Sequence, residues 1–298
     1  MSGLRLKLPA TSANLGPGFD AVGLALSMHL TVEAHAAPAF EIHATGRNAD
    51  LCGALENNLI LDTYRGVLER AGKPVHPLHL KLHNEIPLGR GCGSSAAALV
   101  AGVALADHFG GLQLGGQRIV AEASRLEGHP DNVAACWYGG FTVSAQDGDA
   151  IHAATFPGDP TWQLLLAVPS ASLATKTARA LLPESYTKAD AIFNVQRSSL
   201  LVAAFAQRRL YLLATAMQDR MHQQYRAEAC PLLKTLLPLT AEPEVAGVTL
   251  SGAGPSVLLF LAAETTILEA ETRLSGLLDA SVELLPLRIG EGVDRTLL

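Results

Sequence analysis

The stretch PLGRGCGSSAAALVAG, residues 87–102, constrains the fold of this chain more than any other part of its sequence. Its glycines allow backbone conformations that a side chain would forbid, and they let the backbone approach a ligand closely. From Ser94 to about His108 the residues are apolar on nearly every helical face, which predicts a buried helix. The first N–H groups of such a helix form an anion site, and phosphate is its usual occupant. The hydroxyls of Ser94 and Ser95 could cap the helix, donate to a phosphate or bind a hard cation.

This loop does not decide the function by itself. It is not a Walker A loop, because no Lys-Ser or Lys-Thr follows its last glycine, and it lacks the GxGxxG spacing of dinucleotide folds. A glycine-rich turn with a serine cap is the purely structural alternative. The net charge of −6 lacks the basic footprint needed for nucleic acid or an anionic membrane. The longest apolar run, about 96–106, is shorter than the roughly 20 residues of a membrane span.

The N-terminus and the cysteines indicate a cytoplasmic protein. The first residues, MSGLRLKLPATS, lack the apolar block of a secretory signal. The four cysteines lie far apart in the sequence and form no CxxC pair. Free thiols in a reducing compartment are therefore expected, rather than a disulfide framework or a zinc site.

Apolar periodicity predicts clustered strands separated by helices, which is typical of an α+β fold rather than of a doubly wound sheet. Strands are predicted at 4–8, 24–36, 39–45, 78–82, 162–169, 245–250, 257–261 and 282–287. Helices are predicted at 58–71, 94–108, 115–127, 176–182 with 189–207, 210–221 and 265–278. The pattern changes near residues 155–165, so we expect two domains, residues 1–160 and 161–298.

Three more segments accompany the glycine loop: PATSANLGPGFD at 9–20, EGHPDN at 127–132 and SGAGPS at 251–256. In order and spacing, the four segments resemble the motifs of the GHMP kinases, across essentially the whole chain. The resemblance implies an N-terminal ribosomal protein S5 domain 2-like fold and a ferredoxin-like C-terminal domain. The first segment and EGHPDN look like the branch that transfers the γ-phosphoryl group of ATP to L-homoserine, in threonine biosynthesis. The resemblance also implies that the protein binds Mg²⁺ and forms a homodimer.

The resemblance assigns ATP mainly to the glycine loop and to the last motif, which would pack against that loop. The implied residues there are Pro87, Gly89, Arg90, Gly91, Cys92, Gly93, Ser94, Ser95, Gly252 and Gly254. Asn58 would contact the adenosine end, with Asn57 beside it as the alternative. Cys92 stands where the family usually has leucine, and this could make an enzyme sensitive to thiol reagents.

The implied substrate carries both an ammonium and a carboxylate, so its site needs an acid and a planar cation. Bidentate arginine is the preferred partner of a carboxylate. The residues that match family substrate contacts are Asn14, Asp20, His129, Asn132, Thr175, Arg179 and Arg226. Asp20 would meet the ammonium, while Thr175, Arg179 and Arg226 would bind the carboxylate end, with Thr175 and Arg179 on one helical face. Capping residues and solvated surface arginines are the structural alternatives.

By the same resemblance, the Ser95 hydroxyl and the Glu127 carboxylate would hold Mg²⁺, with Glu122 as the alternative glutamate. Asn132 stands where mevalonate kinases carry an aspartate that is thought to take the hydroxyl proton. Because asparagine cannot accept a proton at neutral pH, we expect direct in-line transfer in which electrostatic preorganisation carries the rate. Asp131, whose side chain is expected to point elsewhere, is the alternative general base.

Two other functions stay open at this point. The chain could be another GHMP enzyme with a mevalonate-type substrate, but Asp20 would then have no ammonium to meet. It could also be a non-catalytic nucleotide-binding protein of the same fold. The intact serine, glutamate and glycine loop argue against a non-catalytic protein.

Overall fold

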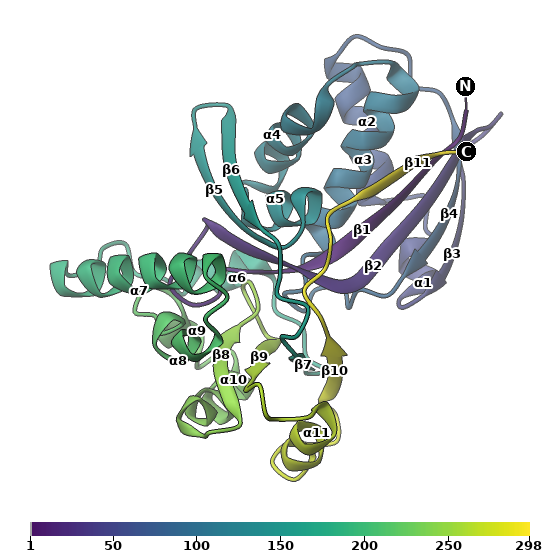
Figure 1. Cartoon of the computed structure of the whole chain (residues 1–298). Coiled ribbons are helices and arrows are strands. Elements are labelled where there is room, and N and C mark those ends of the chain that lie inside the picture. The colour runs from purple at the N-terminus through teal and green to yellow at the C-terminus, as the bar shows by residue number, and fades with distance from the viewer. Residues whose placement is uncertain (1) are drawn as a thin grey trace.

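The computed structural model describes residues 2–298, which fold around two β-sheets (Figure 1). The larger sheet has seven strands: β1 (Leu4–Ala13), β2 (Val22–Ala36), β3 (Glu41–Gly46), β4 (Leu78–Asn84), β5 (Phe141–Asp147), β6 (Ala150–Phe156) and β11 (Asp294–Leu297). The order is β11-β1-β2-β4-β3, and β5 joins the start of β2 and continues to β6. Only β3 and β4 run parallel to each other; the other pairs in this sheet are antiparallel.

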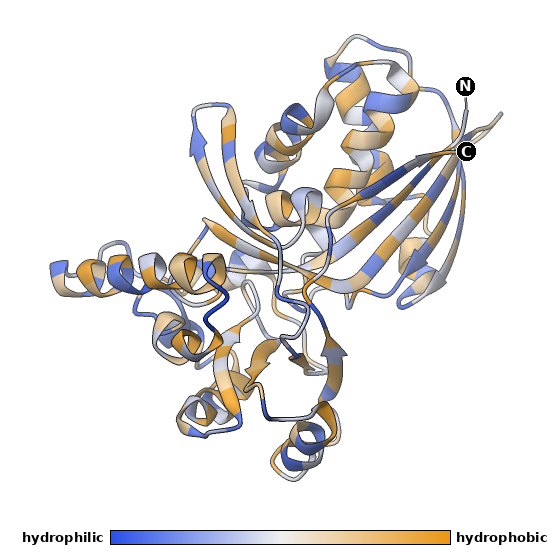
Figure 2. Ribbon diagram, viewed as in Figure 1, coloured by the Kyte–Doolittle hydropathy of each residue, from blue (hydrophilic) through white to orange (hydrophobic). Residues whose placement is uncertain are grey.

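Helices of the N-terminal half cover one face of this sheet (Figure 1). They are α1 (Ala49–Cys52), α2 (Leu59–Arg70), α3 (Ser94–Gly110), α4 (Gly115–Glu127) and α5 (Asp131–Tyr138). The helix that follows the glycine loop, α3, contacts α2, α4, α5 and β1, and most of its residues are buried. Its ribbon is mostly in apolar colours in Figure 2, as the sequence predicts for a helix apolar on nearly every face.

The smaller sheet has four antiparallel strands in the order β10-β7-β9-β8. Their bounds are β7 (Leu164–Val168), β8 (Val245–Leu250), β9 (Val257–Leu261) and β10 (Glu283–Leu287). Between β7 and β8 lie α6 (Thr175–Ala180), α7 (Lys188–Ala206), α8 (Leu213–Ala216), α9 (Gln223–Arg226), α10 (Pro231–Leu236) and the 3₁₀ turns 210–212 and 237–241. α11 (Ile267–Ser275) connects β9 to β10. This βαββαβ order is ferredoxin-like, as the resemblance implies.

One apolar core joins the two halves. Alternate residues of β7 face opposite sides of the small sheet, so that Leu164 and Leu166 belong to the core shared with the large sheet. Phe141 of β5 stacks on Phe205 of α7, with ring centroids 3.9 Å apart, and Trp162 packs edge-on against the same ring. The two halves are therefore held together by continuous apolar packing.

Most predicted elements are confirmed, and some bounds differ. The predicted helix at 210–221 is helical only to Ala216, because Asp219 accepts hydrogen bonds from the N–H groups of Met221, His222 and Gln223 and turns the chain. The sequence analysis did not predict α1, α5, α9, α10, the β5–β6 hairpin or β11. The last strand, 294–297, pairs with β1, so the end of the predicted domain 161–298 returns to the first sheet. Within residues 2–298, no helix combines the length and apolar character of a membrane span.

Candidate active site

Most of the predicted site residues line one cavity between the two halves. Those that line it are Asn14, Asp20, Gly89, Gly91, Cys92, Gly93, Ser94, Ser95, Glu127, His129, Asn132, Thr175, Arg179, Arg226, Gly252 and Gly254. They come from the β1–β2 loop, the glycine loop, the α4–α5 turn, α6, α9 and the β8–β9 turn. Positions that are more than 200 residues apart in sequence are therefore neighbours in the fold.

The glycine loop is held from two sides. Thr11 in β1 donates its backbone N–H to the Cys92 carbonyl over 3.0 Å, and the Ser251 hydroxyl donates to the Gly91 carbonyl over 2.7 Å. A Cβ at Gly91 would lie 2.2 Å from the Ser251 carbonyl oxygen, so this close approach requires glycine. The prediction that the last motif packs against the glycine loop is confirmed.

The start of α3 differs from the predicted serine cap. Gly93, with φ 67°, is the N-cap residue, and no side chain caps the helix. Ser94 and Ser95 are already helical, so their hydroxyls do not satisfy the first N–H groups. These N–H groups lie beside the cavity at the positive end of the helix dipole, where they can accept an anion.

Ser95 and Glu127 meet as the sequence analysis expects. The Ser95 hydroxyl donates to Oε2 of Glu127, the last residue of α4, over 2.8 Å. Burial raises the pKa of the Glu127 carboxyl, although the hydrogen bond from Ser95 opposes this shift. The alternative, Glu122, pairs instead with Arg70 and Arg125 and lines a different cavity. Of the two glutamates, only Glu127 is placed beside the glycine loop.

The α4–α5 turn carries a hydrogen-bonded chain that faces the cavity. The Thr11 hydroxyl donates to Oδ1 of Asn132 over 2.7 Å, and the Asn132 amide donates to Oδ1 of Asp131 over 3.2 Å. Nδ1 of His129 donates to the same Asp131 oxygen over 2.6 Å. Burial lowers the pKa of His129, but the hydrogen bond and charge of Asp131 outweigh burial and raise it above its usual value. The Asn132 amide is therefore held in one orientation.

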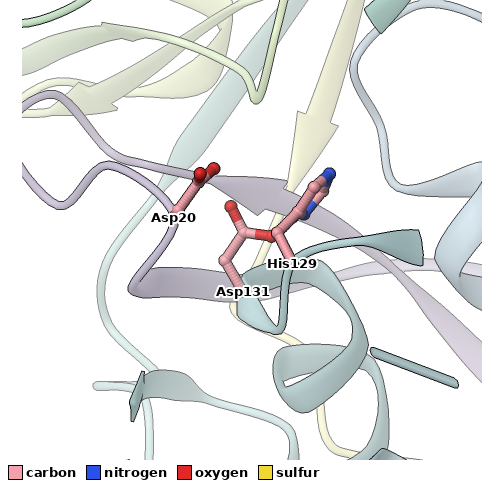
Figure 3. A group of neighbouring side chains, drawn as sticks. All are labelled: Asp20, His129 and Asp131. Carbon is pink, nitrogen blue, oxygen red and sulfur yellow. The ribbon is translucent and has the colours of Figure 1, made fainter. Parts of the chain in front are cut away.

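The expectation that Asp131 points away from the site is wrong. Asp131 is the first residue of α5, and its side chain lies at the helix end that faces the cavity. Figure 3 shows it beside His129, with Asp20 approaching from the β1–β2 loop. One ligand atom from each of these three residues lies within 4.8 Å of the others. Two carboxylates thus share one corner of the cavity, which suits a cation or an ammonium group.

Asp20 and Arg179 pair with each other. Nη1 and Nη2 of Arg179 donate to the two Asp20 oxygens over 3.0 and 2.6 Å. Thr175 begins α6, so it and Arg179 lie one turn apart, as predicted. The Asn14 amide stabilises the β1–β2 loop: it accepts a hydrogen bond from the Asp20 N–H over 3.0 Å and donates one to the Gly252 carbonyl over 2.9 Å. The structural alternative for Asn14 is therefore partly correct, since its amide organises the loop.

Arg226 is not a solvated surface arginine. It is 1% exposed, and its guanidinium donates to the carbonyls of Ala178 and Gly252 and to Nδ1 of His222. Among residues 2–298, no carboxylate lies within ion-pair distance of it. Burial lowers the pKa of this guanidinium, and the charge of Arg179 adds to the shift. A buried arginine that faces a cavity without an anionic partner has the charge and geometry that suit a ligand carboxylate.

Among the predicted nucleotide residues, Pro87 and Arg90 lie outside the first cavity, and the side chains of Asn58 and Cys92 are engaged or covered within the protein. Pro87 is buried and does not line the cavity, and the Arg90 guanidinium turns to the Ser170 carbonyl. The Asn58 amide caps α2 and donates to the carbonyls of Cys52 and Ala54, so its polar atoms are used within the protein. The structure disfavours the expected reactivity of Cys92, because its thiol is buried and burial raises its pKa to about 12.

A second cavity adjoins the glycine loop. Gly89, Ser94 and Ser95 line both cavities, and the second one extends to Asn57 and Asn58. Its volume of about 580 Å³ lies in the usual range for a small-molecule site. The two cavities together offer one space for a nucleoside and another for a small polar substrate, with the glycine loop between them.

Sequence reasoning missed Thr11 and His222, and it considered Asp131 only as an alternative general base. Both Thr11 and Asp131 lie within the motifs, Thr11 in the first one and Asp131 in EGHPDN. The hydrogen-bond partner of Thr11 is more than 100 residues away, and that of Asp131 is its neighbour in the turn. His222 stands one helical turn before Arg226, and this spacing was the only available signal.

Comparison with known proteins agrees with this geometry. Residues 58–140 match the GHMP kinases N terminal domain, and residues 201–277 match the GHMP kinases C terminal domain. The homoserine kinase of Solibacter usitatus is 48% identical, covering 87% of this chain and 85% of its own. A homoserine kinase of Thermus thermophilus is 41% identical, covering 97% of both. The crystal structure of the Cytophaga hutchinsonii homoserine kinase, 24% identical, covers 99% of this chain and 98% of its own with a TM-score of 0.82 and shares the fold. The chain belongs to the GHMP kinase family, among the homoserine kinases.

Proposed function

We propose that this protein transfers the γ-phosphoryl group of ATP to the side-chain hydroxyl of L-homoserine, giving O-phospho-L-homoserine and ADP. The observation that carries the proposal is the buried guanidinium of Arg226, which faces the cavity without a carboxylate partner. The glycine loop at 89–95 lines the same cavity. One cavity thus offers an anion site for phosphate and a cation for an amino-acid carboxylate.

The rest of the polar cavity suits the two charges of an amino acid. The substrate carboxylate binds Arg226 and reaches Arg179, while its ammonium lies between the carboxylates of Asp20 and Asp131. The support for this arrangement is that Arg179 and Asp20 both line the cavity and pair with each other there. A zwitterion can enter there and provide each of these groups with a new partner of opposite charge.

For the nucleotide, we propose that the glycine loop and the turn at Gly252 and Gly254 surround the phosphates, and that the second cavity receives the adenosine. Ser95 and Glu127 are the donors for Mg²⁺, because a hydroxyl and one carboxylate oxygen 2.8 Å apart are hard ligands of the kind this ion takes. Mg²⁺, when bound, supplies positive charge beside the phosphate oxygens. A polar role of Asn58 is disfavoured, which leaves Asn57 as the candidate contact.

For the transfer, we propose that the substrate hydroxyl attacks in line and that its proton passes to the γ-phosphate or to solvent. Asn132 orients the hydroxyl, since Thr11 and Asp131 fix its amide. Oδ1 of Asp131 already accepts three hydrogen bonds, two from Asn132 and one from His129, which argues against it as a strong base. Positioning and preorganised charge carry the rate.

The test is coupled ADP release with L-homoserine, mevalonate and galactose as acceptors. Turnover of homoserine well above that of the other two is expected. Preference for mevalonate would support the other GHMP activity, and ATP binding without turnover of any acceptor would support a non-catalytic protein. The homodimer stays a prediction, which sedimentation velocity can test. The cytoplasmic location also stays a prediction.

A further inference from the structure

His222 connects the β1–β2 loop, which carries Asp20, to Arg226. It is fully buried at the start of α9, where its N–H donates to Asp219 over 2.9 Å. Its Nδ1 lies 3.1 Å from Nη1 of Arg226, and its Nε2 lies 2.8 Å from the Gly16 carbonyl oxygen. Gly16 belongs to the loop between β1 and β2 that carries Asp20. A single imidazole therefore contacts Arg226 on one side and the loop that carries Asp20 on the other.

The two partners determine the protonation of this ring. Arginine can only donate hydrogen bonds, so Nδ1 of His222 must be the acceptor. The Gly16 carbonyl can only accept, so Nε2 must carry the proton. One neutral tautomer satisfies both contacts, and an imidazolium satisfies only one of them. Burial also keeps the pKa of His222 below its usual value, against the opposing charge of Asp219.

The surroundings explain why a neutral acceptor is useful here. The charged groups that face the ring are Asp219, whose Oδ2 lies 3.7 Å from Nε2, together with Arg226 and Asp20. Asp219 accepts four hydrogen bonds, from the N–H groups of 221–223 and from the Asn194 amide, and does not reach Arg226. A carboxylate at position 222 would form an ion pair with the guanidinium and compete with the ligand. An imidazole holds the guanidinium without neutralising its charge.

We propose that His222 is a positioning residue for the reaction: it fixes the Arg226 guanidinium for the substrate carboxylate and ties it to the loop that carries Asp20. The ring also packs on Phe19, with centroids 5.4 Å apart, and the guanidinium of Arg226 lies 5.5 Å from the Phe19 ring centroid. The loop, the ring and the arginine thus form one packed unit. This inference rests on the proposed function, because it concerns recognition of the homoserine carboxylate.

Two amide variants separate the two contacts. In His222→Asn, the side-chain oxygen can take the place of Nδ1 and accept from Arg226, but the amide does not extend to Gly16. In His222→Gln, the amide can reach Gly16 in place of Nε2, but no acceptor stands at the Nδ1 position. Both variants remove the ring, so loss of packing on Phe19 is matched between them.

The readout is carboxylate discrimination: kcat/KM for L-homoserine divided by kcat/KM for 3-aminopropan-1-ol, which is homoserine without its carboxylate. If turnover of the amine is too slow, its inhibition constant against homoserine takes the place of its KM. Loss of a hydrogen bond to a charged group corresponds to about 10- to 100-fold. We expect His222→Gln to lose discrimination by that factor, His222→Asn to stay within about threefold of the unchanged protein, and the KM for ATP to stay constant in both.

Equal discrimination in both variants, with kcat/KM lowered for both substrates alike, would mean a purely structural role and overturn the inference. ¹⁵N NMR of the unchanged protein gives a second test that needs no variant. We expect His222 to be neutral with the proton on Nε2 at pH 7, and an imidazolium or the Nδ1–H tautomer would overturn the inference. Absence of turnover of homoserine by the unchanged protein would instead overturn the proposed function, and the role in substrate recognition with it.

Discussion

Replacing Arg226 by methionine should separate substrate binding from stability. Methionine has a similar length and no charge, so the cavity wall is kept while the carboxylate partner is removed. Removing one member of a buried, hydrogen-bonded charge pair costs about 2–5 kcal/mol, which corresponds to a loss of about 30- to 5,000-fold in kcat/KM for homoserine. We expect the lower half of this range, because Arg179 lines the same cavity and keeps one cation there.

The same substitution should have little effect on folding. Arg226 is 1% exposed and has no ion-pair partner among the described residues, so its removal relieves the cost of burying a lone cation. Against this stand the hydrogen bonds to Ala178, Gly252 and His222, each contributing about 1 kcal/mol. These two effects oppose each other, and we expect the Tm to change by only a few degrees.

The assay is coupled ADP release, with homoserine varied at saturating ATP and ATP varied at saturating homoserine. The KM for homoserine should rise strongly while the KM for ATP changes by less than about twofold. Arg118→Met, at an exposed position on α4 away from the cavity, is the matched control and should leave both constants unchanged. Equal increases in both KM values, or an unchanged kcat/KM for homoserine in a folded variant, would refute the role given to Arg226.

Three further predictions follow from the cavity. Glu127→Gln should lower kcat with Mg²⁺ at least tenfold, whereas loss of activity in Glu122→Gln instead would move the metal role to Glu122. Burial raises the pKa of Glu127, so its charged carboxylate destabilises the fold at neutral pH. The glutamine variant should therefore have a higher Tm at pH 8 and lose this advantage as the pH falls toward about 4.5. Thr11→Val should lower kcat by about tenfold at constant KM for ATP, since it removes the hydrogen bond that holds the Asn132 amide; unchanged kinetics would mean that this amide orientation does not matter. Cys92 should not react with iodoacetamide in the folded protein at pH 8, as mass spectrometry of the peptide can test; rapid labelling of this thiol would contradict its burial.

The sequence predicts the local parts of the site well because local chemistry determines them. The glycine loop precedes α3 as expected, and α4 ends at Glu127 because Gly128 follows it in a left-handed conformation. The β8 and β9 strands also have their predicted bounds. In each case, residue spacing and glycine placement act over a few neighbouring positions, so a single sequence contains the necessary information.

The parts that could not be predicted depend on long-range contacts. The direction of Asp131 is set by its place as the first residue of α5, and by partners that include His129. The return of β11 to pair with β1 joins residues about 290 positions apart, and the short strand 294–297 has no strong apolar pattern of its own. The pairing of Asp20 with Arg179 likewise joins the β1–β2 loop to α6, which only the completed fold brings together.

Charge balance gives a physical reason for the choice of substrate. Apart from the metal donors and the titratable His129, the substrate end of the cavity carries the guanidinium groups of Arg179 and Arg226 and the carboxylates of Asp20 and Asp131, which are two charges of each sign. A zwitterion adds one charge of each sign and leaves this balance unchanged, whereas a mevalonate-type anion adds a negative charge near two carboxylates and brings no ammonium to offset it. An amine without a carboxylate leaves Arg226 buried and unpaired. Each incomplete ligand therefore carries an electrostatic cost that homoserine avoids, and selectivity arises from repulsion and unpaired charge as well as from attraction.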